Sequence, residues 1–339
     1  MRVAVFGAKI YDRSFLSAAN VRFNHDLVFL EPCLELATAK LAEGFAGVCV
    51  FVNDCLDQAV LEQLKGYGVT LVALRCAGFN NIDLRAADTL GITVVRVPAY
   101  SPYAVAEFTI GLLLALERKI PRAWARVRDD NFALDGLIGR NLRGRVAGVV
   151  GTGRIGALVA RTLRLGFGCE VFASDPVANA ELETIGVRYV TAKALLEHSD
   201  IVSLHCPLTP GTRHLINAAT IDRARPGLTI VNTSRGALID TEALVEGLKC
   251  GHIGGVALDV YEQEADLFFT DLSNEIVQDD VFQRLLTFPN VLVTGHQAFL
   301  TEEALAAIAE TTLANIADSE ANRPLANRLT SKKFLPSTN

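Results

Sequence analysis

The chain has 339 residues, which exceeds the usual size of a single compact core, so two domains are expected. Half of its residues are hydrophobic and 21% are charged, a balance that excludes an intrinsically disordered chain. The formal charge of -6 argues against a general nucleic-acid binder, which needs a clustered basic surface.

Short apolar runs alternate with longer amphipathic segments along the chain, a pattern typical of an α/β protein whose parallel sheets are wound with helices. In the first hundred residues the predicted strands are Val3–Phe6, Gly47–Val52, Leu71–Arg75 and Thr93–Val97, and the predicted helices are Leu34–Glu43, Asp57–Lys65 and Leu84–Leu90. Pro98 and Pro102 then break the pattern at a candidate hinge, and a long apolar helix is predicted at Tyr103–Arg118.

A second, more regular series runs from Arg145 to Thr294 and predicts one complete nucleotide-binding sheet. Its predicted strands are 146–150, 169–174, 200–204, 228–233, 253–260 and 291–294. The helix predicted at Glu302–Ile316 could return to the first domain and make it discontinuous. We therefore expect one domain at 1–100 plus 299–330, a nucleotide-binding domain at 101–298, and a flexible tail at 331–339.

The seven cysteines are scattered without a CxxC pair and the six histidines do not cluster, so we expect reduced thiols and no metal ion. The chain begins directly with a strand-like run, which leaves no room for a signal segment. The apolar stretch Ile110–Leu116 is far shorter than the ~20 residues that span a bilayer. A cytoplasmic protein that does not enter the membrane is predicted.

The most specific local motif is GxGxxG at residues 151–156, where an apolar strand runs directly into a helix. Gly151 would allow a tight turn, Gly153 would let a pyrophosphate approach the backbone, and Gly156 would let the helix pack on the strand. The pyrophosphate would meet free N–H groups and the positive end of the helix dipole. The candidate cofactor contacts in this motif are Gly151, Gly153, Arg154, Ile155 and Gly156.

Asp175 ends the next predicted strand, 19 residues beyond Gly156. A carboxylate there would accept hydrogen bonds from both adenosine ribose hydroxyls and would repel a 2′-phosphate. Because no Lys or Arg follows in Pro176–Asn179, the sequence predicts NAD rather than NADP. The alternative is a glycine turn followed by an ordinary strand-end aspartate.

Three later strand ends carry an arginine, a carboxylate and an imidazole, namely Arg235, Glu264 and His296. Since the carboxyl ends of parallel strands meet at one edge of a sheet, we expect these groups to gather there. They are the parts that reduction of a 2-oxoacid needs. Arg235 would bind the substrate carboxylate, and His296 would exchange a proton with the carbonyl oxygen. Glu264 beside the imidazole would favour its protonated form.

Two alternatives stay open at this point. His205 occupies an equivalent strand end and competes with His296, because spacing alone does not separate them. Likewise Glu262 competes with Glu264 as the acidic partner.

The residues around these positions form familiar segments. They are LRCAGFNN at 74–81, VPAYSP at 97–102, SLHCPLT at 203–209, VNTSRGA at 231–237, DVYEQEADLFF at 259–269 and GHQAFLT at 295–301. With them the chain resembles, over nearly its whole length, the D-isomer-specific 2-hydroxyacid dehydrogenase family, nearest to its bacterial-type D-lactate dehydrogenases. The resemblance implies two Rossmann-like doubly wound parallel-sheet domains, the first binding substrate, with the active site in the interdomain cleft and closed by the helix after His296.

The resemblance also implies roles for individual residues. His296 is implied as the acid/base and Glu264 as its partner, and the amides of Ala77 and Gly78 would receive the substrate carboxylate beside Arg235. Tyr100 and Phe299 would shape the substrate pocket, and Phe51 would limit substrate size. The remaining implied cofactor contacts are His205, Cys206, Pro207, Thr212, Thr233, Ser234, Arg235 and Asp259, of which Thr233 to Arg235 and Asp259 would face the nicotinamide.

Two departures from close relatives affect local packing and cofactor affinity rather than the reaction. Phe108 stands where relatives often have a histidine, and Thr212 stands where another polar residue is often used near the dinucleotide. Relatives are homodimers or homotetramers, so self-association is expected.

The implied activity is reduction of pyruvate by NADH to D-lactate. A larger 2-oxoacid, such as phenylpyruvate or a branched-chain one, is the alternative substrate. A non-catalytic NAD-sensing protein of the C-terminal-binding-protein type is the alternative of a different class. It is less favoured, because the chain ends soon after its last helix, without a long disordered tail.

Overall fold

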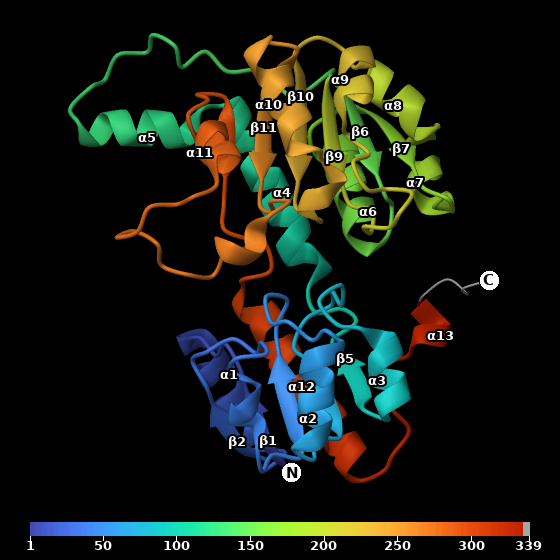
Figure 1. Cartoon of the computed structure of the whole chain (residues 1–339). Helices are drawn as coiled ribbons and strands as arrows, with labels where there is room; N and C mark the ends of the chain where they lie inside the picture. Colours follow the sequence, from blue (N-terminus) through green and yellow to red (C-terminus); the bar gives the residue numbers. More distant parts are fainter. Residues whose placement is uncertain (335–339) are drawn as a thin grey trace. The chain divides into compact units, whose positions relative to one another are not determined.

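The computed structural model describes residues 1–334, and the chain forms two compact units (Figure 1). Unit 1 consists of Met1–Ser101 together with the chain from Leu300 onward, and unit 2 is Pro102–Phe299. Each unit has its own sheet and its own hydrophobic core.

Unit 1 is built on a six-stranded sheet in the order β13-β5-β4-β3-β1-β2. Its strands are β1 (Arg2–Val5), β2 (Asp26–Phe29), β3 (Gly47–Val50), β4 (Leu71–Leu74), β5 (Thr93–Arg96) and β13 (Arg328–Leu329). The strands are parallel except for β13, which pairs antiparallel with β5. The central strands are buried on both faces and read as continuous apolar runs, as parallel strands under helices do.

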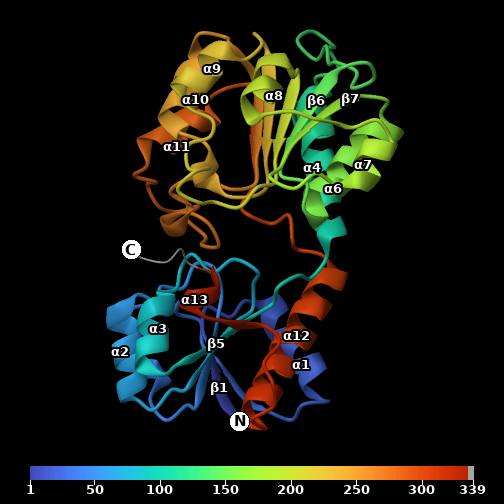
Figure 2. The ribbon, with the colours of Figure 1, turned by 90° about the vertical axis from the view of Figure 1, so that its right-hand side faces the viewer.

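Helices cover both faces of this sheet (Figure 2). They are α1 (Ile10–Asn20), α2 (Gln58–Gly66), α3 (Leu84–Leu90), α12 (Glu302–Glu320) and α13 (Ser331–Phe334), with a short 3₁₀ turn at Ala39–Ala42. α1 and α12 lie side by side, and Leu16, Leu313 and Ile316 join one core cluster with strand residues. The chain therefore returns to unit 1 through α12 after completing unit 2.

Unit 2 is a seven-stranded parallel sheet in the order β12-β11-β10-β9-β6-β7-β8. Its strands are β6 (Val146–Val150), β7 (Glu170–Ser174), β8 (Arg188–Tyr189), β9 (Ile201–Leu204), β10 (Leu228–Asn232), β11 (Ile253–Leu258) and β12 (Val291–Val293). The order reverses between β9 and β6, as in a doubly wound fold, and such reversals are where nucleotides bind.

Unit 2 has two separate cores, one on each face of its sheet. Its helices are α4 (Pro102–Glu117), α5 (Ile120–Arg128), α6 (Arg154–Arg161), α7 (Ala180–Thr184), α8 (Ala192–His198), α9 (Ala218–Arg223), α10 (Thr241–Lys249) and α11 (Asp280–Leu286). α4, α6 and α7 contribute to one core, and α8 to α11 contribute to the other. Short segments η2 (Thr162–Gly166), η3 (Gly236–Leu238) and η4 (Glu264–Asp266) complete the unit.

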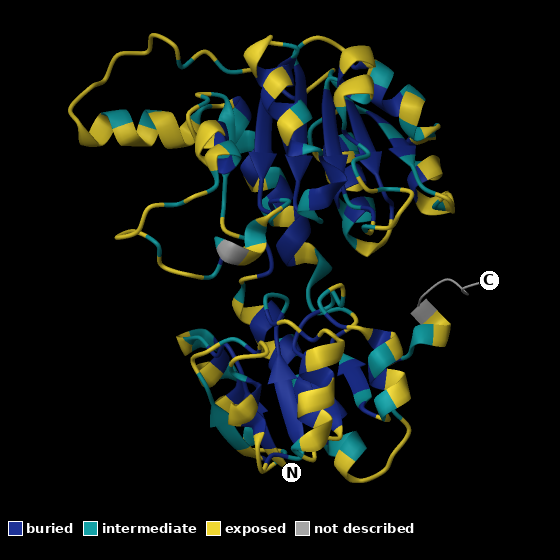
Figure 3. Ribbon diagram, viewed as in Figure 1, coloured by how far each residue is buried: buried dark blue, intermediate teal, exposed yellow. Residues whose placement is uncertain are grey.

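Helix α5 differs from the other α-helices of unit 2 because it has no buried residue (Figure 3). Large apolar side chains are exposed on α5 and on the segment that follows it: Ile120, Trp124, Val127, Phe132, Leu134 and Ile138. No helix within residues 1–334 is both long enough and apolar enough to cross a membrane.

Three sequence predictions differ from the structure. The helix predicted at Leu34–Glu43 is only a 3₁₀ turn at Ala39–Ala42, because Thr38 Oγ1 donates to the carbonyl of Cys33 and competes with helical hydrogen bonds. The helix predicted to end at Ile316 continues to Glu320. Within the predicted tail, α13 is helical, and Ser331 donates through N and Oγ to Asp88; residues 335–339 lie outside the described residues.

Candidate active site

The glycine turn after β6 offers open space beside a helix N-terminus. Gly151 has φ +90°, and a Cβ there would lie 2.6 Å from the amide nitrogen of Cys206. A Cβ on Gly156 would lie 1.9 Å from the carbonyl oxygen of Gly151, so only glycine allows α6 to start this close to β6. A Cβ on Gly153 would meet nothing within 4 Å. Because no side chain caps α6, its first N–H groups face this space, which suits a pyrophosphate.

Asp175 follows β7 and is held by two backbone amides. Oδ2 accepts from Thr152 N at 2.7 Å, and Oδ1 accepts from Val177 N at 2.9 Å. Each carboxylate oxygen keeps a further lone pair for a ribose hydroxyl. Asp175 forms no ion pair with any described residue, so a 2′-phosphate would meet an uncompensated negative charge. The residues present therefore fit NAD.

Arg235 lies in the turn that follows β10. The buried Asn232 shapes this turn, since its Nδ2 donates to the carbonyl of Arg235 at 2.9 Å and its Oδ1 accepts from Ser234 N at 3.0 Å. Arg235 Nη1 donates to the carbonyl of Ser234 at 2.6 Å. Within residues 1–334 this is the only hydrogen bond of the guanidinium, so most of its donors remain available to a carboxylate.

The turn after β10 contacts the loop after β11 through Gly236. A Cβ on Gly236 would lie 2.0 Å from the carbonyl carbon of Tyr261, so the two backbones touch. The amide of Tyr261 donates to Glu264 Oε2 at 2.9 Å. The Tyr261 ring packs against Phe282, with centroids 4.9 Å apart, and its hydroxyl donates to Asp279. These contacts fix the backbone that carries Glu264 directly beside the turn that carries Arg235.

His296 follows β12, and its Nδ1 lies 2.9 Å from Glu264 Oε1. Since an ionised carboxylate only accepts hydrogen bonds, Nδ1 carries the proton of this bond. The imidazole packs against Phe269, with centroids 5.5 Å apart, and its backbone has φ +53°. Nε2 has no hydrogen bond to any described residue. The hydrogen bond to Nδ1 thus orients the ring and leaves Nε2 available to a bound molecule.

Asp259 holds the segment that contains His296. Its carboxylate accepts from Thr294 Oγ1 at 2.6 Å, from Gln297 N at 2.9 Å and from Ala298 N at 2.8 Å. Burial raises the pKa of Asp259, while these three donors and the nearby imidazole oppose the rise. The side chain is 0% exposed, and its three hydrogen bonds hold the segment that contains His296 in place. That Asp259 faces the nicotinamide stays a prediction.

The two alternatives from the sequence have different partners. His205 Nε2 lies 2.7 Å from Ser203 Oγ, and burial lowers the pKa of His205 to about 4, so this imidazole is neutral at neutral pH. Glu262 Oε1 accepts from His214 Nε2 at 2.6 Å and from Arg213 Nη2 at 3.1 Å. Of the two carboxylates, Glu264 is therefore the one bonded to His296.

Other predicted cofactor contacts in unit 2 also lie at the carboxyl ends of the strands. Ser234 Oγ donates to the carbonyl of Cys206 at 2.8 Å, next to the glycine turn. Thr233 Oγ1 lies 2.8 Å from Thr109 Oγ1 on α4. Thr212 Oγ1 donates to the carbonyl of Pro207 at 2.7 Å and so shapes the loop after β9. Phe108, one of the departures, packs against the core on the α4 side.

Four predicted substrate contacts belong to unit 1, and their approach to Arg235 stays a prediction. Phe51 follows β3 and stacks on the guanidinium of Arg75, 5.3 Å from its ring centroid. Ala77 and Gly78 follow β4, and Tyr100 follows β5. They lie at one edge of the sheet of unit 1. Phe299 is the last residue of unit 2 and is buried.

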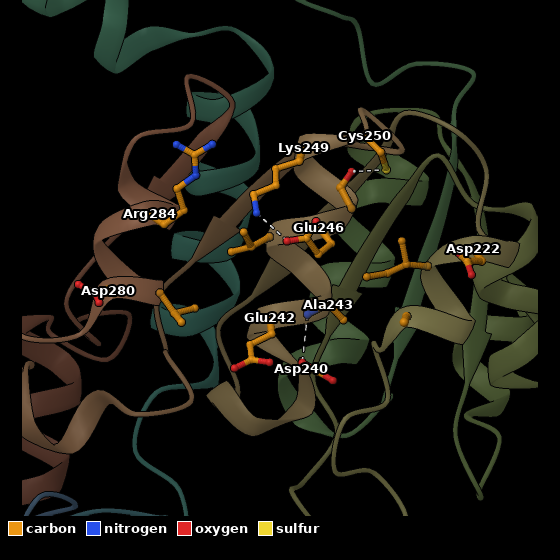
Figure 4. A pocket seen from close by; sticks show the side chains of 14 residues that line it. Asp222, Asp240, Glu242, Ala243, Glu246, Lys249, Cys250, Asp280 and Arg284 are labelled. Atoms are coloured by element: carbon orange, nitrogen blue, oxygen red, sulfur yellow. Dashed lines mark hydrogen bonds and ion pairs between the residues drawn. The ribbon is translucent and has the colours of Figure 1, made fainter.

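A separate open pocket of about 720 Å³ lies between α9, α10 and α11 (Figure 4). Its lining combines apolar residues such as Ile221 and Val245 with a Lys249–Glu246 ion pair. None of the residues predicted for catalysis or cofactor binding lines it. Among the described residues, no group of three or more His, Cys, Asp or Glu side chains is arranged to hold a metal ion.

Sequence reasoning missed Asn232, Gly236 and the amide of Tyr261. An Asn at the end of a strand can accept a hydrogen bond from the backbone two residues on, and a glycine soon after it marks a turn. The pattern NTSRG was therefore a usable signal for the first two. No local sequence pattern indicates the role of Tyr261, because that role depends on the hydrogen bond from its backbone amide to the Glu264 carboxylate.

Unit 2 thus has the fold and the polar site of a nucleotide-dependent oxidoreductase. The family model described as D-isomer specific 2-hydroxyacid dehydrogenase, NAD binding domain, matches residues 110–298. The 2-hydroxyacid dehydrogenase homolog 1 of Schizosaccharomyces pombe is 54% identical over 326 residues, covering 96% of this chain and 98% of the relative. The D-lactate dehydrogenase of Escherichia coli is 51% identical over 329 residues, covering 97% of this chain and 100% of the relative.

Solved structures agree with these relatives. The pyruvate reductase of Chlamydomonas reinhardtii superposes with a TM-score of 0.91 at 47% identity, covering 96% of this chain and 98% of that one. The D-lactate dehydrogenase of Aquifex aeolicus, solved with NAD and lactic acid, has a TM-score of 0.84 at 32% identity, covering 95% and 96%. The chain belongs to the D-isomer-specific 2-hydroxyacid dehydrogenase family, and its cofactor is NAD.

Proposed function

We propose that this protein is a D-lactate dehydrogenase that interconverts pyruvate and D-lactate with NADH and NAD. The observation that carries the proposal is the imidazole of His296, which is bonded to Glu264 through Nδ1 and has Nε2 available. The E. coli D-lactate dehydrogenase and the Chlamydomonas pyruvate reductase support the choice of pyruvate.

The cofactor would be held by the glycine turn and by Asp175. The pyrophosphate would lie over Gly153 at the N-terminus of α6, and Asp175 would accept hydrogen bonds from the ribose. Bound NADH supplies the hydride for carbon 2 of the substrate. Residues of the loops after β9 and β10 would line the rest of the dinucleotide: His205, Cys206, Pro207, Thr212, Thr233 and Ser234.

The substrate would be bound and protonated by residues of this chain. Arg235 would bind the carboxylate with its available N–H donors, together with the amides of Ala77 and Gly78. His296, protonated on both nitrogens, would donate the Nε2 proton to the carbonyl oxygen, and Glu264 would stabilise the imidazolium beforehand. In the oxidative direction the neutral Nε2 would accept the proton of the hydroxyl group.

A substrate panel tests the proposal. The purified protein is assayed by NADH absorbance with pyruvate, phenylpyruvate and a branched-chain 2-oxoacid, and the chirality of the product is determined. Pyruvate should be reduced with the highest kcat/KM and give D-lactate. Faster reduction of the bulky 2-oxoacids with little turnover of pyruvate would make this a dehydrogenase of larger substrates. NADH binding without turnover of any 2-oxoacid would favour an NAD-sensing protein.

We further propose that the protein self-associates through α5 and the segment after it. A nine-residue helix with no buried residue gains little packing energy within its own unit, and isolated helices of this length are marginal in water. A second copy is the proposed occupant because family members are expected to be homodimers or homotetramers. Trp124 is the only tryptophan and is exposed, so burial between two copies should shift its fluorescence emission to the blue. Light scattering should give the mass of an oligomer for the wild type and a smaller mass for Trp124→Asp. A monomer at micromolar concentration would contradict this.

A cytoplasmic location is also proposed. All seven cysteines are free thiols, which suits a reducing compartment. Fractionation of the source cells checks this, with activity expected in the cytosolic fraction.

A further inference from the structure

Arg96 lies where β5 ends and extends its side chain to the loop after β4. Leu74, the last residue of β4, is in register with Arg96. Arg96 Nη1 donates to the carbonyl oxygen of Ala77 at 2.7 Å, a short hydrogen bond for a charged donor. The guanidinium carbon lies 4.9 Å from the ring centroid of Phe79. The guanidinium is thus held by a hydrogen bond and by an aromatic face.

The backbone of Arg96 is held by two asparagines from the far end of the chain. Its N–H donates to the carbonyl of Asn327 at 3.2 Å, and its carbonyl accepts from Asn315 Nδ2 at 2.9 Å. Asn327 Nδ2 in turn donates to Asn315 Oδ1 at 2.9 Å. Asn315 is buried on α12, where an amide is costly unless it is hydrogen bonded. This pair therefore fixes the position from which Arg96 reaches the loop.

The bond to Ala77 determines the direction of the next N–H group. The peptide bond between Ala77 and Gly78 is trans, so the N–H of Gly78 points opposite to the carbonyl that Arg96 binds. Neither the N–H of Ala77 nor that of Gly78 has an acceptor among the described residues, and both residues are only half-buried. Two adjacent N–H groups without an acceptor suit a carboxylate.

The guanidinium of Arg96 on the carbonyl of Ala77 also makes the N–H of Gly78, in the same peptide group, a stronger hydrogen-bond donor. Hydrogen bonds in a chain polarise one another, by about 10–30% per bond in condensed-phase estimates. Because the guanidinium stays charged at neutral pH, this polarisation is permanent.

We propose that Arg96 is a positioning residue for substrate binding, which orients and polarises the Ala77–Gly78 peptide group toward the carboxylate of the 2-oxoacid. It acts through the peptide group and does not touch the substrate. This inference rests on the proposed function, because it takes the amides of Ala77 and Gly78 as carboxylate donors.

The test compares Arg96→Gln, Arg96→Lys and a matched control, Arg2→Gln. Arg2 is also an arginine of the unit 1 sheet and lies 4.6 Å from the ring centroid of Phe45, but on β1 and in an exposed ion pair with Asp26. The measurements are kcat and KM with the best 2-oxoacid of the panel, the Kd of oxamate in the presence of NADH, the Kd of NADH, and Tm.

Arg96→Gln should raise KM and the oxamate Kd about tenfold, with a smaller change in kcat and no change in NADH affinity. Arg96→Lys keeps the charge and a donor but loses the flat stacking face, so its oxamate Kd should lie between wild type and Arg96→Gln. Arg2→Gln should match wild type. Unchanged oxamate binding in Arg96→Gln would overturn the proposal. So would a loss of oxamate and NADH affinity in parallel with Tm, which a purely structural arginine would produce.

The two proposals fail in different ways. If the wild type turns over a 2-oxoacid but Arg96→Gln behaves like it, only the role of Arg96 is rejected. If the wild type binds no oxamate and turns over no 2-oxoacid, the proposed function is rejected and the role of Arg96 with it.

Discussion

Unit 2 contains two pairs of a histidine and a glutamate that share one loop but differ in their surroundings. Glu262 and Glu264 both follow β11, and each bonds a histidine, His214 at 2.6 Å and His296 at 2.9 Å. Both histidines have positive φ, of 50° and 53°, a conformation that costs energy for a non-glycine residue. The two pairs are therefore nearly equivalent in residue type and in the backbone conformation of the histidine.

The difference lies in the second nitrogen of each imidazole. His214 Nδ1 faces Asp240 at 4.0 Å, and Glu262 also accepts from Arg213 and Thr241, so that pair is surrounded by its own partners. His296 Nε2 has no hydrogen-bond partner among the described residues. An imidazole with an acidic partner can exchange a proton with a substrate only where its other nitrogen is available. The comparison therefore supports the proposed catalytic role of His296 and Glu264 and favours a structural role for His214 and Glu262.

The largest expected effect follows from removing the proposed acid/base. His296→Gln should lower kcat by about 10²–10⁴-fold, because positioned proton transfer is lost. NADH affinity, measured by fluorescence titration, should stay within twofold of wild type. Wild-type turnover by this variant would place the proton transfer elsewhere.

Removing the acidic partner should have a smaller effect on the same step. Glu264→Gln keeps a hydrogen-bonding side chain but loses the charge that favours the imidazolium. A charge-assisted hydrogen bond contributes about 1.5–3 kcal/mol, so kcat/KM should fall roughly 10- to 150-fold. The control is Glu246→Gln, which removes an exposed carboxylate on α10 and should leave kcat/KM unchanged.

Removing the imidazole of His205 should change the stability of the protein in acid. Its folded pKa is lowered by burial from the ordinary 6.5 to about 4, so the unfolded chain takes up a proton first as pH falls. The associated stability is present above pH 6.5 and is lost between about 6.5 and 4. It corresponds to about 3 kcal/mol for a fully buried group, and roughly 2 kcal/mol is expected because the ring is partly exposed.

Urea unfolding at pH 7 and pH 4.5 measures this loss. His205→Asn should lose less stability than wild type between the two values. Equal losses would mean that His205 is protonated in the folded protein.

The smallest effect is expected at the second pair. His214→Gln or Glu262→Gln should leave kcat within about threefold of wild type and lower the free energy of unfolding by about 1 kcal/mol, since the pair is partly exposed. Urea denaturation and steady-state kinetics check both values. A large loss of kcat at unchanged stability would reverse the assignment of the two pairs.

The parts of the fold and site that could be predicted from the sequence depend on local pattern. The buried strands read as apolar runs, and the glycine motif sits between a strand and a helix. The strand ends indicated where polar groups gather, so Arg235, Glu264 and His296 could be proposed as one site. Strands β2, β8 and β13 were missed, and the last two carry too little pattern because each has only two residues.

What the sequence did not provide depends on contacts between distant residues. Spacing did not separate Glu264 from Glu262 or His296 from His205, because a carboxylate partner and burial decide between them. The cofactor role of Asp259 came from the family resemblance alone, and no pattern in the sequence indicated that its carboxylate would accept hydrogen bonds from three residues between 294 and 298. The bond from Asn315 to Arg96 joins residues 219 positions apart, which no local pattern encodes.

The absence of a side chain at Gly236 has a consequence for engineering this enzyme. The spacing between the turn of Arg235 and the loop of Glu264 is fixed by main chain against main chain, so no repacking of side chains could absorb even an added methyl group. Redesign for new substrates should therefore leave that junction unaltered and vary the unit 1 positions that are predicted to contact substrate, such as Phe51 and Tyr100.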